Sequence, residues 1–165
     1  MPEVKSLAQK MEWAPDKTAE LVQKVEAALK SEELKGELEK SPVKAVMVYS
    51  SAEGGLVVKF MKGQGLISFK GGRQQATIYL KSVSAGAIVG GGAQWAAGLV
   101  LGLNSEEDFG GDYRGVTKSA AAGDTIKSDG IFLEGGKEHK IFLVSTVRGV
   151  SAEAGKTKLT ITRGW

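Results

Sequence analysis

Basic side chains are the residues of this sequence whose types and positions fit a chemical role. Lys and Arg donors that converge from several directions can hold a phosphate group. Lys59, Lys62, Lys70 and Arg73 lie on or beside a series of short strand-like runs, and Arg148 lies later in the chain. We expect these five to bind an anionic ligand. The alternative is that each is a solvated charge that keeps an exposed sheet soluble.

Other kinds of site find little support. The chain has no cysteine, which excludes disulfides, thiolate zinc sites and a cysteine nucleophile. Its one histidine, His139, lies in a turn-like stretch without a second ligand, so we expect it to be exposed. Glu106, Glu107, Asp108 and Asp112 lack the spacing of a calcium loop and are interpreted as a charged loop. We therefore expect neither an enzyme nor a bound metal or cofactor.

Charge is unevenly distributed along the 165 residues. Residues 1–42 contain 7 Lys and 9 Asp plus Glu, a net charge of −2, whereas residues 43–165 carry 15 Lys plus Arg and 10 Asp plus Glu, a net charge of +5. The basic excess favours an anionic partner, but it does not by itself distinguish a lipid from a nucleic acid or an acidic protein. A hydrophobic content of 42% indicates one folded domain over residues 1–165.

The N-terminal segment lacks the apolar run of a signal peptide, which predicts a cytoplasmic protein, although a removed leader is an open alternative. Val4, Leu7, Ala8 and Met11 share one helical face. The segment 4–13 could lie in a bilayer interface, with the Trp at its end at headgroup depth, but we favour packing of these side chains on the rest of the domain.

Two helices and then a sheet are expected to position the basic residues. Apolar residues recur at helical spacing within residues 16–40, Ser31 fits an N-cap, and Pro42 stops the second helix. From residue 43 onward, short β-branched runs alternate with glycine-rich turns, as in an antiparallel barrel. The predicted class is α+β, with an N-terminal helix pair (within residues 1–42) packed on an antiparallel, barrel-like β-sheet (residues 43–165).

The stretch SVSAGAIVGGGAQWAAGLVLGLN, residues 82–104, is apolar and rich in glycine. Its glycines disfavour a membrane span, and it lacks the order of a phosphate-binding glycine loop. We predict two buried strand segments over residues 83–103, joined near Gly90–Gly92, with Gly98 facing another element at close range. Trp95 is interpreted as a core residue that fills the room left by its small neighbours.

The order of several short motifs resembles the SYLF domain family. The resemblance runs from about Asp16 to Ile161 and rests on the sequence of motifs rather than on any single one. They are Lys44-Ala45, Gly54-Gly55, Gly63-Gln64-Gly65 (a Gly-x-Gly hairpin in the family), Ser84 to Gly92, Leu103-Asn104-Ser105 and Ser145 to Gly149. Arg148 lies in the last of these, a turn that resembles Ser-x-x-Arg-Gly.

This resemblance implies non-enzymatic binding of anionic phospholipid, such as phosphoinositide, by a protein that is peripheral at membranes. It also implies an alternative, in which the domain is a protein-interaction module that binds actin or an envelope partner. No nucleic-acid partner is expected. The segment between the predicted hairpin and the glycine stretch, RQQATIYLKSV, departs from the family pattern, which usually has Trp and Pro there.

Overall fold

The computed structural model describes residues 2–54, 58–85, 93–116, 130–135, 139–145 and 158–165. Three α-helices precede the strands, and one short 3₁₀ helix follows the fourth strand. The helices are α1 (Pro2–Lys10), α2 (Pro15–Leu29), α3 (Glu32–Lys40) and η1 (Glu106–Asp108). The strands are β1 (Val43–Gly54), β2 (Val58–Phe69), β3 (Ala76–Ala85), β4 (Ala93–Leu101), β5 (Gly111–Val116), β6 (Gly130–Gly135), β7 (His139–Ser145) and β8 (Lys158–Arg163).

The predicted helix pair is confirmed as α2 and α3. Pro15 occupies the start of α2, where its missing N–H costs nothing, and the helix buries a stripe that includes Leu21 and Val25. The Ser31 hydroxyl caps α3 by accepting a hydrogen bond from the Leu34 N–H at 3.3 Å. The helices therefore form where the periodicity and the capping residue predict them.

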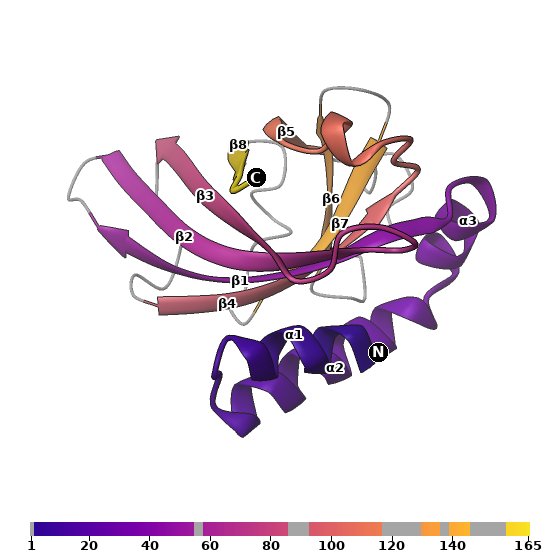
Figure 1. Cartoon of the computed structure of the whole chain (residues 1–165), viewed down its shortest axis with the longest axis horizontal. Coiled ribbons are helices and arrows are strands. Elements are labelled where there is room, and N and C mark those ends of the chain that lie inside the picture. Colours follow the sequence, from indigo (N-terminus) through magenta and orange to yellow (C-terminus); the bar gives the residue numbers. More distant parts are fainter. Residues whose placement is uncertain (1, 55–57, 86–92, 117–129, 136–138, 146–157) are drawn as a thin grey trace.

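The strands form a closed antiparallel barrel, so the α+β class and the barrel-like sheet are both confirmed. Around the barrel the order is β1-β2-β3-β8-β5-β6-β7-β4. Every described pair of neighbouring strands is antiparallel. Figure 1 shows β1, β2 and β3 curving strongly around one side, while β5, β6 and β7 complete the other. Closure pairs the edges that an open sheet would leave free.

Two apolar cores lie on opposite surfaces of the barrel wall. The interior core includes Met47 and Ile67, whereas the outer core includes Val48 and Leu99 and packs against the helices. Alternation along each strand produces this division, because neighbouring residues face opposite sides of a sheet. Helices α1 and α2 lie directly below β1 and β4, and α3 lies beside the start of β1, at one end of the barrel (Figure 1).

Helix α1 uses its apolar face for packing. Val4, Leu7 and Ala8 are fully buried in the outer core, and Met11 and Trp13 pack partly buried against it. The favoured alternative, packing on the domain, is therefore confirmed for this segment. Its apolar stripe is occupied by the barrel wall.

The glycine-rich stretch contributes to β3 and β4, with residues 86–92 outside the described part. A Cβ at Gly98 would lie 2.9 Å from Met47 Cγ and 3.1 Å from Ile141 Cγ2. The close approach predicted at Gly98 is thus confirmed. Among the described residues, no helix combines the length and the apolar character that crossing a membrane requires.

Trp95 occupies a different place from the one predicted. It is half-buried and packs against the helix-facing core, with the Lys17 ammonium 5.3 Å from its ring centroid. The room beside Gly98 is filled by Met47 and Ile141 instead. Strand alternation explains the error, because Trp95 is one residue out of phase with the inward-facing Ala96.

The expected hairpin at Gly63-Gln64-Gly65 is also wrong, since these residues lie within β2. Gly65 is opposite Tyr49 in β1, and a Cβ there would lie 2.7 Å from Tyr49 Cβ. Glycine is required at this position by the close approach of β1. The turn after β2 lies at KGGR instead, where Gly71 has φ +73°.

Candidate functional site

The structure brings the predicted basic residues to two separate places. Lys62 is exposed within β2, while Lys70 and Arg73 are exposed in the turn that follows the strand. Lys59 lies in β2 opposite Ser84, but its side chain is outside the described part. Arg148 lies outside the described residues altogether. Lys70 follows Lys62 by eight positions, which span about 26 Å along an extended chain, so the two places are distinct.

The first place is a pair of lysines that face each other across two strands. Lys62 of β2 is directly opposite Lys81 of β3, and both side chains are exposed. Directly opposed side chains on one face of an antiparallel pair have Cβ atoms about 5 Å apart, and like charges in that position repel each other. An anion between the two ammonium groups would relieve this repulsion.

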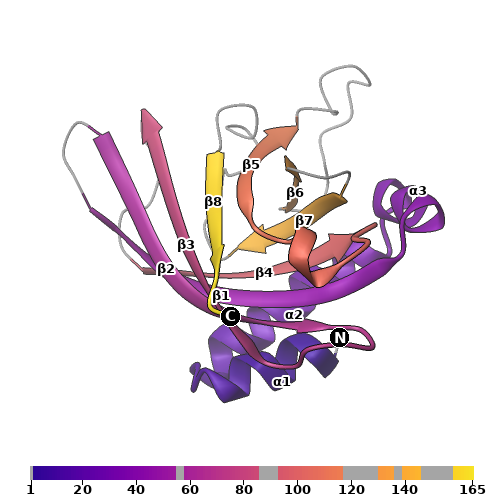
Figure 2. The ribbon, with the colours of Figure 1, turned by 45° about the horizontal axis from the view of Figure 1, so that its top comes forward.

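These lysines belong to a polar surface that we call the open wall. It consists of the outward-facing residues Lys62 and Gln64 of β2, Tyr79 and Lys81 of β3, and Thr162 of β8, all of them exposed. Tyr79 is 49% exposed and is the only exposed large hydrophobic residue among those that the structure describes. The open wall lies away from the helices, which pack under β1 and β4 (Figure 2).

The second place is the turn between β2 and β3, where the side chain of Arg73 packs against an aromatic ring and its backbone N–H binds an acidic residue. The Arg73 guanidinium lies 5.4 Å from the centroid of the Trp165 ring, and the Arg73 N–H donates to Glu106 Oε1 at 2.6 Å. Arg163, at the end of β8, donates to the Glu107 carbonyl oxygen at 3.1 Å. Acidic η1 therefore offsets the positive charge of this turn.

Three of the four acidic residues interpreted as a charged loop form the short helix η1, and Asp112 lies in β5. Glu106, Glu107 and Asp108 form η1, which Ser105 caps by accepting from the Glu107 N–H at 3.3 Å. Asp112 accepts a hydrogen bond from the Thr160 hydroxyl at 2.7 Å. Within the described ranges, no three His, Cys, Asp or Glu side chains come together in a way that could hold a metal ion.

His139 is buried, which corrects the expectation that it is exposed. Its side chain is 2% exposed, and Nε2 forms a hydrogen bond of 2.8 Å with the hydroxyl of fully buried Tyr113. Strand alternation explains the burial, because His139 shares the inner face of β7 with Ile141 and Leu143. The histidine is part of the barrel interior.

Tyr113 links this interior pair to the backbone. Its hydroxyl oxygen accepts a hydrogen bond from the Gly110 N–H at 2.9 Å. Burial raises the pKa of Tyr113 to about 12, which the hydrogen bond from Gly110 only partly offsets. The phenol therefore stays protonated at neutral pH and has a proton to donate to Nε2 of His139.

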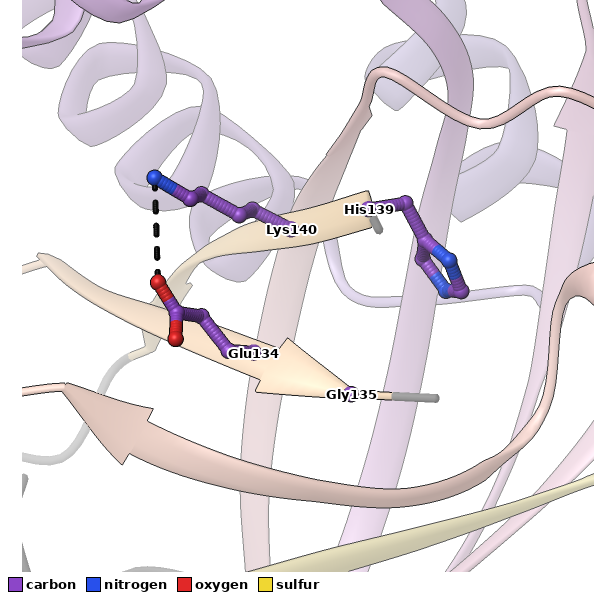
Figure 3. A pocket seen from close by; sticks show the side chains of 4 residues that line it. All are labelled: Glu134, Gly135, His139 and Lys140. Atoms are coloured by element: carbon purple, nitrogen blue, oxygen red, sulfur yellow. Dashed lines mark ion pairs between the residues drawn. The ribbon is translucent and has the colours of Figure 1, made fainter. Parts of the chain in front are cut away.

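A cavity of about 430 Å³ lies beside this pair and is lined by Glu134, Gly135, His139 and Lys140 (Figure 3). Lys140 Nζ lies 3.7 Å from Glu134 Oε1 and 3.4 Å from Glu37 Oε2, so its charge is matched by two carboxylates. His139 points away from that ion pair (Figure 3). The four lining residues therefore offer neither an unmatched charge nor a nucleophile for a ligand.

Sequence reasoning missed Lys81 and Tyr79, although a signal was present. In ATIYLKSV the apolar Ile78 and Leu80 alternate with these two residues, which places Tyr79 and Lys81 on the face opposite the core. The pairing of Lys81 with Lys62 depends on the β2–β3 register, which the misplaced hairpin at residues 63–65 obscured.

Comparison with known proteins supports the fold. No family model matches the chain, and no match is found among curated proteins. Among solved structures, the chain is similar to a beta-barrel-like, uncharacterized protein from Brucella abortus, with 14% sequence identity and a TM-score of 0.59. The similarity covers 88% of this chain and 92% of the other. The chain thus shares a barrel architecture with a protein whose own function is uncharacterized.

Proposed function

We propose that this protein is a SYLF-like domain that binds anionic phospholipid at a membrane surface, without catalysis, through the open wall. The observation that carries the proposal is the pair of exposed, directly opposed lysines, Lys62 and Lys81. Two further points support it. The order of motifs resembles the SYLF family, and the barrel expected from that resemblance is the fold that the chain shares with the similar Brucella protein.

The geometry of the open wall suits a flat, negatively charged surface. Its charged groups project from neighbouring strands of one sheet, so they reach the same plane together. Each Lys or Arg near an anionic membrane contributes about 1 kcal/mol of binding free energy. Lipid phosphates also relieve the repulsion between Lys62 and Lys81, and Tyr79 beside them suits the headgroup region, where aromatic side chains with a polar tip are favoured.

The test measures sedimentation with liposomes of graded anionic lipid content. Binding should require anionic lipid and should weaken as salt rises from about 10 to 500 mM, because the Debye length falls from about 30 Å to a few Å. The double substitution Lys62→Ser with Lys81→Ser should lower affinity by about tenfold or more, from two lost contributions of about 1 kcal/mol each. Its melting temperature should not fall, because both side chains are exposed.

A matched control removes the same charge elsewhere. Lys30→Ser with Lys35→Ser changes two exposed lysines of the helical part and lowers the net charge equally. This control should retain most of the affinity. Equal losses in the two double variants would show that only net charge matters and would reject a site at Lys62 and Lys81.

The turn residues provide a second comparison. Lys70→Ser with Arg73→Ser should weaken liposome binding less than the change at Lys62 and Lys81, because acidic η1 lies against that turn. A parent protein that ignores lipid charge would contradict the proposal. Co-sedimentation with actin filaments would then test the protein-interaction alternative.

A further inference from the structure

A second cavity, of about 480 Å³, lies between α1 and α2, and no residue of the open wall lines it. Its size falls within the range of small-molecule sites in proteins. The residues that line it come from both helices and from the connection between them, and they include Lys5, Gln9, Trp13, Pro15, Val22 and Gln23. None of the basic residues proposed above for membrane binding contributes to it.

A strained turn positions the aromatic wall of this cavity. Glu12 adopts φ +60°, the left-handed conformation that usually requires glycine. The Glu12 N–H donates to the Gln9 carbonyl at 3.0 Å and the Trp13 N–H to the Ala8 carbonyl at 3.1 Å, which is the Schellman pattern at a helix end. The turn brings Trp13 back against the helix pair.

The indole of Trp13 has an unmet hydrogen-bonding requirement. Its Nε1 is buried, and it finds no acceptor among the residues that the structure describes. A buried donor without a partner is costly, and native proteins rarely leave one without a water molecule or a ligand. The Trp13 side chain lines the cavity, but Nε1 has almost no exposed surface, so a ligand in the cavity reaches this donor only when the side chains that cover it move aside.

The cavity combines one positive charge with an apolar surface. Lys5 is the only charged residue among those that line it, and Gln9 lies one helical turn further along α1. Pro15, Ala19 and Val22 of α2 supply the apolar part. A ligand for this cavity therefore needs a single negative charge, a hydrogen-bond acceptor and an apolar body.

We propose that the α1–α2 cavity binds a small carboxylate that carries an aliphatic chain, such as a medium-chain fatty acid. One carboxylate oxygen would pair with the Lys5 ammonium and the other would accept from Trp13 Nε1, while the chain lies along Val22. A carboxylate is favoured over a phosphate monoester. One cation and one hydrogen-bond donor match the single negative charge of a carboxylate better than the charge of nearly −2 on a phosphate monoester.

The test uses decanoate below its micelle concentration and follows the three tryptophan indole N–H signals by NMR. Trp13→Phe assigns the signal of interest. Decanoate should move the Trp13 signal downfield and leave those of Trp95 and Trp165 nearly unchanged. Decanol, which lacks the charge, and acetate, which lacks the chain, should bind at least about tenfold more weakly.

A pair of variants on α1 isolates the role of charge. Lys5→Gln should weaken decanoate binding about tenfold or more, the scale of one charge-assisted hydrogen bond, whereas Lys10→Gln should leave it unchanged. Lys10 is an exposed lysine of the same helix that does not line the cavity. An unmoved Trp13 signal, or equal decanoate binding by the two variants, would reject the proposed site.

The same variants separate this site from the membrane-binding proposal. Lys5→Gln should bind anionic liposomes like the parent, because liposome binding is assigned to Lys62 and Lys81. Loss of liposome and decanoate binding together in Lys5→Gln would show that α1 belongs to a membrane-binding surface and would reject a separate carboxylate site. Loss of liposome binding in the Lys62 and Lys81 double variant should leave decanoate binding intact.

Discussion

Two groups of strands in the barrel share the same alternation of inward and outward residues but differ in what covers their outer surface. On the side formed by β1, β4 and β7, which we call the covered wall, outward-facing residues such as Val48 and Leu99 are buried under the helices. On the open wall, the corresponding outward positions hold Tyr79, Lys81 and other polar residues. The inner faces of both walls are apolar. The outward residues of a strand are therefore apolar where helices cover the strand and polar where solvent does.

The largest difference in stability between the two walls is expected when one lysine is placed on each. Leu99→Lys buries a charge at a position that is 1% exposed and should cost about 3–5 kcal/mol of unfolding free energy, because Leu99 belongs to the apolar outer core. Thr162→Lys at an exposed position should change the unfolding free energy by no more than about 0.5 kcal/mol. Urea denaturation measures both, and similar costs would mean that the open wall is covered as well.

The next largest effect concerns Tyr113, whose side chain lies in the interior core of the barrel. Its pKa is about 12 in the fold and 10.0 without the protein environment. A raised pKa means that burial of the neutral phenol stabilises the fold fully below pH 10, and that this contribution is lost as pH rises towards 12. The loss should amount to about 2–3 kcal/mol between these pH values.

Tyr113→Phe should remove this pH dependence, and Tyr79→Phe at the exposed position should not. At neutral pH, Tyr113→Phe should also cost about 1–3 kcal/mol, because Gly110 N–H and His139 lose a buried partner. Denaturation measured at several pH values between 9 and 12 tests both expectations. Parallel curves for the parent and Tyr113→Phe would contradict the assignment of the effect to this phenol.

A smaller effect tests how tightly the covered wall is built. Gly98→Val should lower the unfolding free energy by about 1–3 kcal/mol through overpacking, since Met47 and Ile141 already occupy the space around a Cβ. Gly36→Ala in α3 is the control, because nothing lies within 4 Å of a Cβ there, and it should stabilise the helix slightly. A harmless valine at position 98 would show that the wall has room to adjust.

Local patterns predicted the helices and the two classes of strand face, but they did not predict which strands meet. The periodicity before Pro42 and the Ser31 cap are properties of neighbouring residues, and both were confirmed. Gly63 to Gly65 resembles a turn because glycine is common in turns. The need for a residue without a Cβ at position 65 comes instead from Tyr49 of the neighbouring strand.

The candidate site shows the same division between local and long-range information. Lys62 could be selected as a basic residue from the sequence, but its partner Lys81 follows only from the β2–β3 register. His139 could have been placed inside the barrel from its alternation with Ile141 and Leu143. Its partner Tyr113 could not, because β5 and β7 are separated by β6 in the barrel and contact each other only across its interior.

The smallest expected effect lies in the helical cover itself, at Glu12. Left-handed backbone costs a residue with a Cβ about 1 kcal/mol, and glycine adopts it freely. Glu12→Gly should therefore raise the unfolding free energy by up to about 1 kcal/mol, while Glu12→Ala, which keeps a Cβ, should not. Thermal denaturation of the two variants measures the difference. Equal stabilities would mean that the turn before Trp13 is not strained, and a stabilised glycine variant that also binds decanoate more weakly would show that the strained turn is retained to position Trp13 for its ligand.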